Sequence, residues 1–388
     1  MPHLRPARLT HIAGIGVDRM GSLADASGCD MLRLENLDTD IPPDPEAVAR
    51  TRAAAGEDPA NSYLPFVGQD RLRDAAARHV SALSGVAYGR DNVVIAAGGL
   101  SGILNALLAT IEVGDEVIVT DPTYAGLLNR VRLAGGVPRQ VPFRFQPGAE
   151  WRLDRDVLRA AVGPRTRAML LMSPSMPSGG VLDAEDWALV VELCTGHELL
   201  LILDSAMERL LFDGRQVIHP AALPGMAERT VTVGAASKEL RMIGWRVGWT
   251  VAPTWLMPDL VAVSLANVVV PVGIAQDAAA VALERSPETL PAYVTELQRR
   301  RDAVTEALHG LPFGLPAGGW STLLRVSDFG MNGAAMSERL LEHGVCATGM
   351  AGWGAAHGAE YIRFVFANEP VERLRRLGPA VRATLDVQ

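Results

Sequence analysis

Lysine is almost absent from this chain. Its 388 residues include 36 lysine and arginine side chains, and Lys238 is the single lysine among them. Arginine makes salt bridges and phosphate contacts at least as well as lysine, but it does not lose its proton in a protein. A deprotonated lysine can attack a carbonyl group and hold it as an imine. The one position that kept lysine is therefore a candidate covalent site. The alternative is a surface lysine left by chance in an arginine-rich composition.

Cysteine and runs of one kind of residue are also scarce. Cys29, Cys194 and Cys346 have no paired spacing, which argues against a disulfide framework or a metal site and indicates a reducing compartment. The net charge is −8 and no basic run is present, so nucleic acid and anionic membranes are not expected partners. No apolar run resembles a signal peptide or reaches the ~20 residues of a membrane span. We expect a soluble cytoplasmic protein.

Short apolar runs alternate with helical periods through the middle of the chain. The runs cover residues 92–96, 116–120, 137–141, 168–172, 199–203, 230–233 and 250–251. Apolar strands that alternate with helices are typical of a mostly parallel sheet covered on both faces. The sequence therefore predicts an α/β fold, with about seven strands in one large domain.

The pattern changes after residue 271. We expect a helix at 273–284, a break at Ser286-Pro287 and a long polar helix to residue 310. The strands and helices that follow predict a smaller α+β domain at the C-terminus. The predicted division has an irregular N-terminal segment at residues 1–45 that packs on the small domain, a large domain at 46–285 and the small domain at 286–388.

Polar residues follow several of the predicted strands. Ligands of open α/β sheets lie at the carboxyl ends of the strands, so these residues are expected to meet in one site. Gly98-Gly99 stands where a helix begins after the first strand, and amides there can approach an anion. Asp204 follows five apolar residues, so we expect it to be buried and to need a cationic partner. Lys238 follows the sixth strand. A simple strand-to-helix turn remains the alternative for the glycines.

The sequence around Lys238 resembles the lysine motif of class I/II aminotransferases, which are pyridoxal-phosphate (PLP) enzymes of fold type I. Ser237-Lys238 is followed by Gly244-x-Arg246-x-Gly248, with the arginine eight positions after the lysine. The resemblance implies the PLP-dependent transferase fold. It also implies that Lys238 carries the cofactor as a Schiff base and moves the substrate's α-proton, while Ser237 and Arg246 hold the phosphate.

Other positions match the same family. The resemblance assigns the phosphate to Gly99, Leu100 and Ser101, and the face of the pyridine ring to Tyr124. It assigns the pyridine nitrogen to Asp204 and the substrate α-carboxylate to Arg363. Tyr63 would reach the phosphate of a neighbouring subunit, which implies a homodimer with shared sites.

The chain departs from the family pattern at several positions. Ala235 stands where the family usually has another serine or threonine for the phosphate. Met176 and Met207 stand where the family has an asparagine and a tyrosine that donate to the cofactor's phenolic oxygen. We hypothesise that this oxygen is therefore more basic and holds the imine proton more strongly. Glu35 stands in place of a glycine close to the substrate. It is either a solvated loop residue or a group that favours a substrate with a second cation, such as a basic amino acid.

The leading functional hypothesis is a PLP-dependent aminotransferase that moves an amino group from an amino acid to a 2-oxo acid. The two methionines leave open a lyase, a cyclase or an oxidase on the same fold. A PLP-binding regulator without turnover is the alternative of another class, but the sequence has no basic helix-turn-helix segment.

Overall fold

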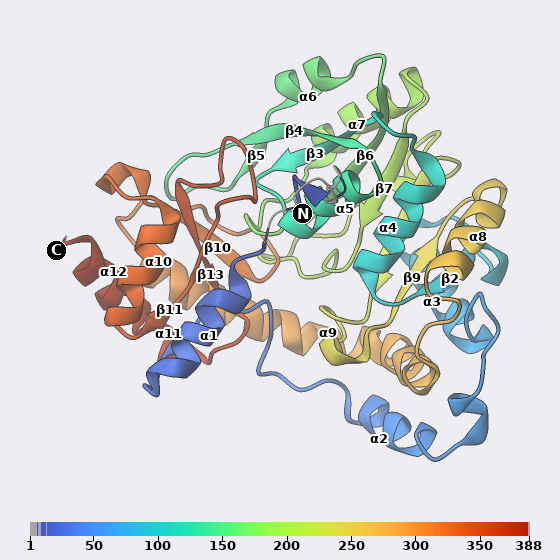
Figure 1. Ribbon diagram of the computed structural model, residues 1–388, viewed down its shortest axis with the longest axis horizontal. Helices are drawn as coiled ribbons and strands as arrows, with labels where there is room; N and C mark the ends of the chain where they lie inside the picture. Colours follow the sequence, from blue (N-terminus) through green and yellow to red (C-terminus); the bar gives the residue numbers. More distant parts are fainter. Residues whose placement is uncertain (1–5, 7–8, 13, 387–388) are drawn as a thin grey trace.

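A central sheet of eight strands organises the larger part of the molecule (Figure 1). The computed structural model describes residues 6, 9–12 and 14–386. The strand order is β2-β9-β8-β7-β6-β3-β4-β5. The bounds are β2 Val93–Ala96, β3 Glu116–Asp121, β4 Val137–Arg144, β5 Arg152–Leu153, β6 Thr166–Met172, β7 Leu200–Asp204, β8 Thr230–Ala235 and β9 Gly248–Val251. The seven expected strands are all present, and the two-residue β5 is additional.

The sheet is mostly parallel, as predicted. β4, β3, β6, β7 and β8 pair in parallel. β9 runs antiparallel to both of its neighbours, and β5 runs antiparallel to β4. The carboxyl ends of the parallel strands therefore meet at one edge of the sheet, which is where a ligand site is expected.

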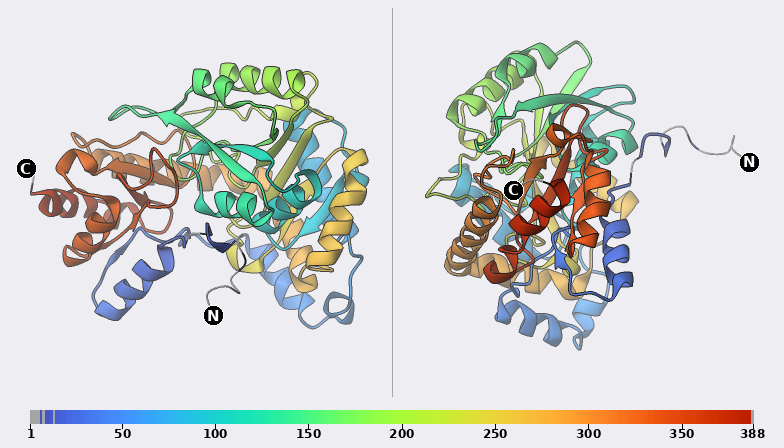
Figure 2. Two further views of the ribbon diagram at one scale, coloured as in Figure 1. Left: turned by 45° about the horizontal axis from the view of Figure 1, so that its top comes forward. Right: turned by 90° about the vertical axis from the view of Figure 1, so that its left-hand side faces the viewer.

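Helices cover both faces of this sheet (Figure 2). They are α3 Asp70–Ser84, α4 Gly99–Thr110, α5 Ala125–Leu133, α6 Arg155–Ala161, α7 Ala184–Gly196 and α8 Met257–Asn267. Successive residues of a strand point to opposite faces. In β7, Leu201 and Leu203 belong to the core beneath α7, whereas Ile202 belongs to the core beneath α4, α5 and α8. Burial on both faces explains why this strand is an unbroken apolar run.

The C-terminal part has its own three-stranded sheet, in the order β10-β13-β12. The strands are β10 Ser321–Arg325, β12 Thr348–Gly349 and β13 Tyr361–Val365, and the helices are α10 Gly333–Glu342, α11 Val371–Leu374 and α12 Leu377–Leu385. A separate parallel pair joins β1 Leu32–Arg33 to β11 Val345–Cys346. The N-terminal segment therefore lies against this part of the chain.

The N-terminal segment is not irregular throughout, so that prediction was wrong. It contains β1 and the helix α1 Val17–Ser27. Gly16 and Gly28 border α1 with φ values of 80° and 64°. Glycine adopts this left-handed conformation readily, so both residues delimit the helix. In the sequence the same glycines look like loop residues. Burial of Met20 and Ala24, which lie one turn apart on the same face, stabilises the segment as a helix.

The predicted break at Ser286-Pro287 was also wrong. The helices α2 Pro45–Ala54 and α9 Gly273–Ala307 pack together, and α9 continues through both Pro287 and Pro291. A proline lacks the N–H that would bond the carbonyl four residues earlier. The Ser286 hydroxyl donates to that carbonyl, on Leu283, at 2.8 Å. The helix thus keeps its polar groups satisfied across the proline, and the domain division at residue 286 stays a prediction.

Within the described part of the chain, no helix is both long and apolar enough to cross a membrane. Nor do the described residues contain a cluster of three or more side chains able to hold a metal ion.

Candidate functional site

A cavity of about 240 Å³ lies at the carboxyl ends of the parallel strands. Nine of the predicted site residues line it: Gly99, Leu100, Tyr124, Met176, Asp204, Met207, Ser237, Lys238 and Arg246. Leu37, Met172, Ala206, Ala235 and Ile243 complete the lining. The predicted residues Ser101, Tyr63, Arg363 and Glu35 are not part of it. The loops after β2, β3, β6, β7 and β8 therefore meet around one space.

Lys238 lies on the wall of this cavity. Its Nζ donates to the Leu37 carbonyl at 2.8 Å and lies 4.2 Å from the centre of the Trp320 ring. Burial lowers the pKa of Lys238 to about 7, although the negative charge of Asp38 opposes this shift. An ordinary lysine is almost fully protonated at neutral pH. The only lysine of the chain is therefore poised to be a neutral amine, which is the form that attacks a carbonyl.

Asp204 ends β7 and is 7% exposed. Burial raises the pKa of Asp204 to about 6, while a hydrogen bond from the Ala206 amide, at 3.2 Å, opposes this shift. A buried carboxylate with so little compensation is costly unless a cation pairs with it. Because Asp204 lines the cavity, a bound ligand can supply that cation.

An anion-binding cradle occupies one end of the cavity. Gly98 caps α4 with φ 92°, and a Cβ atom there would come within 2.7 Å of Nη2 of Arg246. Arg246 has φ 54°, and its Nη1 lies 2.9 Å from the Ile243 carbonyl and 3.5 Å from the Ser237 hydroxyl. A guanidinium group, a hydroxyl group and the first amides of a helix therefore meet, and each attracts a phosphate.

Tyr124 presents its ring to the cavity at the beginning of α5. A Cβ atom on Gly126 would lie 2.4 Å from this ring, so a glycine is needed there to leave it room. The Tyr124 ring also contacts the Trp353 ring, with the centroids 5.2 Å apart and the planes at 62°. The tyrosine is thus held in place by its surroundings.

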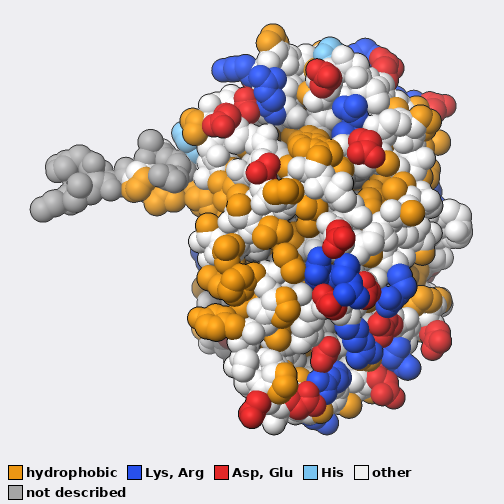
Figure 3. All heavy atoms as spheres, turned by 90° about the vertical axis from the view of Figure 1, so that its right-hand side faces the viewer, with side chains coloured by type: hydrophobic (Ala, Val, Ile, Leu, Met, Phe, Trp, Pro, Cys, Tyr) orange, Lys and Arg blue, Asp and Glu red, His pale blue; other side chains and the backbone are white. Residues whose placement is uncertain are grey.

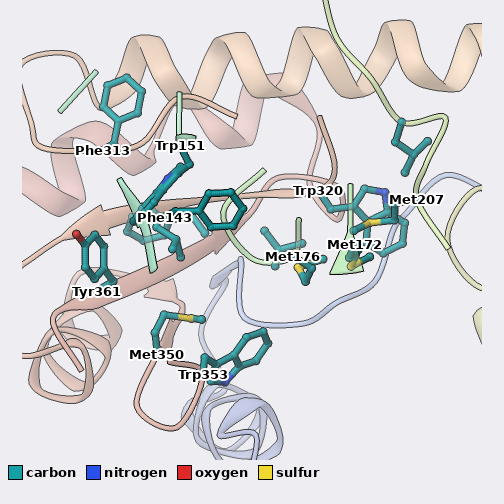
Figure 4. Close-up of a cluster of buried hydrophobic side chains, with 14 of the residues drawn as sticks. Phe143, Trp151, Met172, Met176, Met207, Phe313, Trp320, Met350, Trp353 and Tyr361 are labelled. Carbon is teal, nitrogen blue, oxygen red and sulfur yellow. The ribbon is translucent and has the colours of Figure 1, made fainter. Parts of the chain in front are cut away.

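Methionine side chains form a wall of the cavity, as Figure 4 shows beside Trp320. Met176 and Met207 are 4% and 1% exposed. The thioether of Met176 accepts a hydrogen bond from Ser321 at 3.4 Å. Because a thioether has no hydrogen to donate, neither methionine can supply a hydrogen bond to an oxygen in the cavity.

Arg363 is fully buried in β13. Its Nη2 donates to the backbone carbonyl of Glu35 at 2.5 Å, and its Cζ lies 4.5 Å from the centre of the Trp353 ring. Nε and Nη1 of Arg363 have no hydrogen-bond partner among the described residues. Free N–H donors on a guanidinium group are chemically matched to the oxygens of a carboxylate.

Glu35 has a different environment from the predicted one. Its Oε1 accepts from Nε of Arg33 at 2.8 Å, so its carboxylate is already paired within the chain. Only its backbone carbonyl points to Arg363. Its second carboxylate oxygen, Oε2, has no hydrogen-bond partner among the described residues, so recognition of a second cation on the substrate stays a prediction.

Comparisons with known proteins identify the family of this chain. Residues 33–380 match the family model "Aminotransferase class I and II". The chain belongs to this family. It is 36% identical over 322 residues to an arginine–pyruvate transaminase of Pseudomonas aeruginosa, with 81% of each chain covered. It is 32% identical to aromatic-amino-acid aminotransferase 2 of Thermococcus litoralis, with 84% of this chain and 86% of the relative covered.

Solved aminotransferase structures have the same fold. The N-succinyldiaminopimelate aminotransferase of Mycobacterium tuberculosis superposes with a TM-score of 0.90 at 29% identity, over 97% of this chain and 100% of that one. The predicted fold type I architecture is confirmed. The chain is a PLP-dependent aminotransferase that transfers an amino group between an amino acid and a 2-oxo acid.

The residues of the cavity fit PLP. The cofactor has an aldehyde, a phosphate and a ring nitrogen that can be protonated. The cavity offers a neutral amine on Lys238, an anion cradle at Arg246 and a buried carboxylate on Asp204 that has no cationic partner within hydrogen-bond distance among the described residues. The aldehyde, the phosphate and the ring nitrogen of PLP thus each have a chemically matched residue on the aminotransferase.

Three residues that contact Lys238 or Arg363 were missed by sequence reasoning. Leu37 contributes only its backbone carbonyl, which every residue possesses, so no sequence signal could have identified it. Trp320 and Trp353 are apolar residues in buried segments and look like ordinary core side chains. Only their contacts with Lys238 and Arg363 reveal them, because these cations lie over the two rings.

Proposed function

We propose that the cavity around Lys238 is the active site of this aminotransferase. The observation that carries the proposal is a buried amine with a pKa of about 7, in a space that also contains an anion cradle and a buried acid. When bound, PLP supplies an aldehyde that reacts with amines and a ring that withdraws electrons from the substrate's α-carbon. Ser237, Arg246 and the first amides of α4 would hold its phosphate.

Each remaining residue has one task in this proposal. Lys238, as a free amine beside the Leu37 carbonyl, takes the proton from the substrate's α-carbon and returns it. Asp204 keeps the ring nitrogen protonated, because a buried carboxylate favours a cation next to it. Tyr124 packs on the face of the ring, and Arg363 binds the α-carboxylate through its unpaired N–H donors.

Arginine with pyruvate is the first substrate pair to test, since a relative at 36% identity is named for that reaction. The purified holoenzyme is mixed with arginine, with an aromatic amino acid and with aspartate in turn, and its absorbance is recorded. In an aminotransferase, the absorbance of the resting cofactor disappears when the amino acid is added. It returns only after a 2-oxo acid is added. Turnover that needs no 2-oxo acid would instead indicate the lyase, cyclase or oxidase alternative.

The methionine wall predicts an unusual pH dependence of colour. In Met176→Asn, the new amide can donate to the phenolic oxygen of the cofactor and stabilise its anionic form. We expect the pH of the absorbance transition to fall by about one unit. Met176→Leu removes the sulfur without adding a donor, so it should leave the transition in place. An unchanged transition in Met176→Asn would show that the missing donor has no role.

We also propose a homodimer. Figure 3 shows hydrophobic side chains spread over the face that carries α8. Exposed apolar residues flank a shallow concavity there, and Tyr63 is 84% exposed. Contiguous apolar surface often marks an interface. The exposure of Tyr63 suits contact with a neighbouring subunit, since the side chain does not reach its own cavity.

Replacing Val272 with aspartate tests this interface. Val272 is 47% exposed and lines the concavity beside Tyr63. A buried charge opposes association, so Val272→Asp should shift a dimer towards monomer in sedimentation velocity. Val113→Asp is the matched control, because Val113 is 86% exposed and lies outside the concavity. If both variants sediment like the wild type, another face forms the interface.

A cytoplasmic location is proposed as well. The described cysteines, Cys29, Cys194 and Cys346, are all free thiols, which is typical of a reducing compartment.

A further inference from the structure

Trp353 lies between two groups of the proposed active site. It is fully buried in the loop between β12 and β13. Its ring centre is 4.5 Å from Cζ of Arg363 and 5.2 Å from the centre of the Tyr124 ring. Figure 4 shows it apart from the larger aromatic cluster around Trp151. One indole therefore touches both the carboxylate-binding arginine and the ring that faces the cavity.

Trp353 is held by one hydrogen bond of its side chain and one of its backbone. The indole Nε1 donates to the carbonyl of Ile15 at 3.3 Å, and the backbone carbonyl of Trp353 accepts from the Thr123 amide at 2.9 Å. Trp353 thus connects the N-terminal segment with the turn between β3 and α5. The position of Trp353 is therefore set by contacts that do not involve Arg363.

The loop after Trp353 is held to the end of β3 by one carboxylate. Asp121 accepts hydrogen bonds from the amides of residues 355–357 at 2.8, 2.7 and 3.1 Å. A Cβ atom on Gly354 would come within 2.0 Å of Oδ1 of Asp121, so only glycine permits this approach. The position of the indole is therefore set by the end of the large sheet, although Trp353 belongs to the C-terminal part of the chain.

Arg363 depends on this ring for its orientation. Among the described residues, the guanidinium of Arg363 has one hydrogen-bond acceptor, the Glu35 carbonyl. That single contact leaves the guanidinium plane free to turn about the line that joins Nη2 to the carbonyl oxygen. The face of the indole supplies the second constraint, because a guanidinium stacks on an aromatic face. With the plane fixed, the direction of the unpaired N–H donors of Arg363 is fixed as well, so they can bind a carboxylate that lies in that plane.

We propose that Trp353 is a positioning residue that sets the plane of Arg363 for the substrate's α-carboxylate. The inference rests on the proposed role of Arg363. A cation–π contact of this kind corresponds to about 2- to 30-fold in affinity. The effect should appear only for ligands that carry the carboxylate.

The test compares two ligands that differ in that one group. They are the amino acid that changes the holoenzyme absorbance fastest and the amine left when its carboxylate is removed, which for arginine is agmatine. Trp353→Met fills most of the space without an aromatic face, whereas Trp353→Phe keeps a face and loses the N–H to Ile15. We expect the Met variant to bind the amino acid about tenfold more weakly and the amine within about twofold of wild type. The Phe variant should stay within about threefold for both ligands.

The variant Arg363→Leu distinguishes the proposed role of Arg363 from the inference about Trp353. If this variant still discriminates between amino acid and amine, the proposed role of Arg363 fails and the inference falls with it. If Arg363→Leu loses discrimination while Trp353→Met keeps it, only the inference is overturned. Equal weakening of both ligands in Trp353→Met indicates a merely structural role and also overturns it. If Trp353→Met does not fold, Trp353→Phe provides the test, because phenylalanine still presents an aromatic face to Arg363. The inference is then overturned if Trp353→Phe weakens amino-acid binding as much as Arg363→Leu does.

Discussion

Replacing Lys238 with arginine is expected to lower turnover about 10⁴-fold, because the variant keeps the positive charge and loses both the nucleophile and the proton carrier. Arginine stays protonated at every accessible pH, so raising the pH should not restore activity. The holoenzyme of Lys238→Arg should also lack the absorbance of an imine-bound cofactor. Steady-state rates and spectra between pH 6 and pH 10 provide the measurement.

The composition of this chain offers a matched control for that variant. Arg299 is exposed on α9, so Arg299→Lys should be silent alone. The double variant Lys238→Arg with Arg299→Lys has the composition of the wild type, with its lysine in a different place. We expect it to be as inactive as the single variant. Turnover within tenfold of wild type in Lys238→Arg would refute a covalent role for this lysine.

Asp204→Asn is expected to lower turnover by about 10²- to 10³-fold, as the loss of a buried electrostatic partner does in other active sites. The same change should stabilise the cofactor-free protein. Folding raises the pKa of Asp204 from 3.8 to about 6, so the folded state binds this proton more tightly than the unfolded state. The buried carboxylate therefore lowers the free energy of unfolding. This loss of stability is absent below about pH 4, grows between pH 4 and pH 6, and is complete above pH 6.

The shift of about two units corresponds to about 3 kcal/mol at neutral pH, as an order of magnitude. Urea unfolding of the cofactor-free protein should therefore show Asp204→Asn to be more stable than wild type at pH 7 and equal to it at pH 4. A residue that costs stability and supports turnover is typical of a functional site. A less stable Asn variant at pH 7 would mean that a partner within the protein already compensates the carboxylate.

The sequence predicted the sheet and most of the cavity for a clear physical reason. Strands buried on both faces are apolar runs, and ligand groups gather where such runs end, so Asp204 and Lys238 could be placed together before any coordinates were known. Segments whose structure depends on contacts distant in sequence were harder to predict. The helix α9 continues through Pro287 because a neighbouring hydroxyl satisfies the freed carbonyl, and propensity alone does not reveal that.

The direction in which a side chain points was also difficult to predict from the sequence. Glu35 was expected to be either a solvated loop residue or a group that favours a substrate with a second cation. Instead it is 1% exposed, Arg33 binds its carboxylate and its carbonyl meets Arg363. The sequence gives the residue type but not which of its polar groups faces the site. Trp320 and Trp353 were missed for the related reason that a tryptophan in the core and a tryptophan beneath a functional cation look alike in a sequence.

The most direct test of the central claim is the titration of Lys238 in the cofactor-free protein. Because the chain has one lysine, brief acetylation at a series of pH values, followed by mass spectrometry of the peptide that contains Lys238, measures this amine alone. Burial predicts a midpoint for its reactivity near pH 7, the pKa of about 7 given by its surroundings. A midpoint near the ordinary lysine value of 10.5 would contradict the account, because the amine would then be protonated when it is needed.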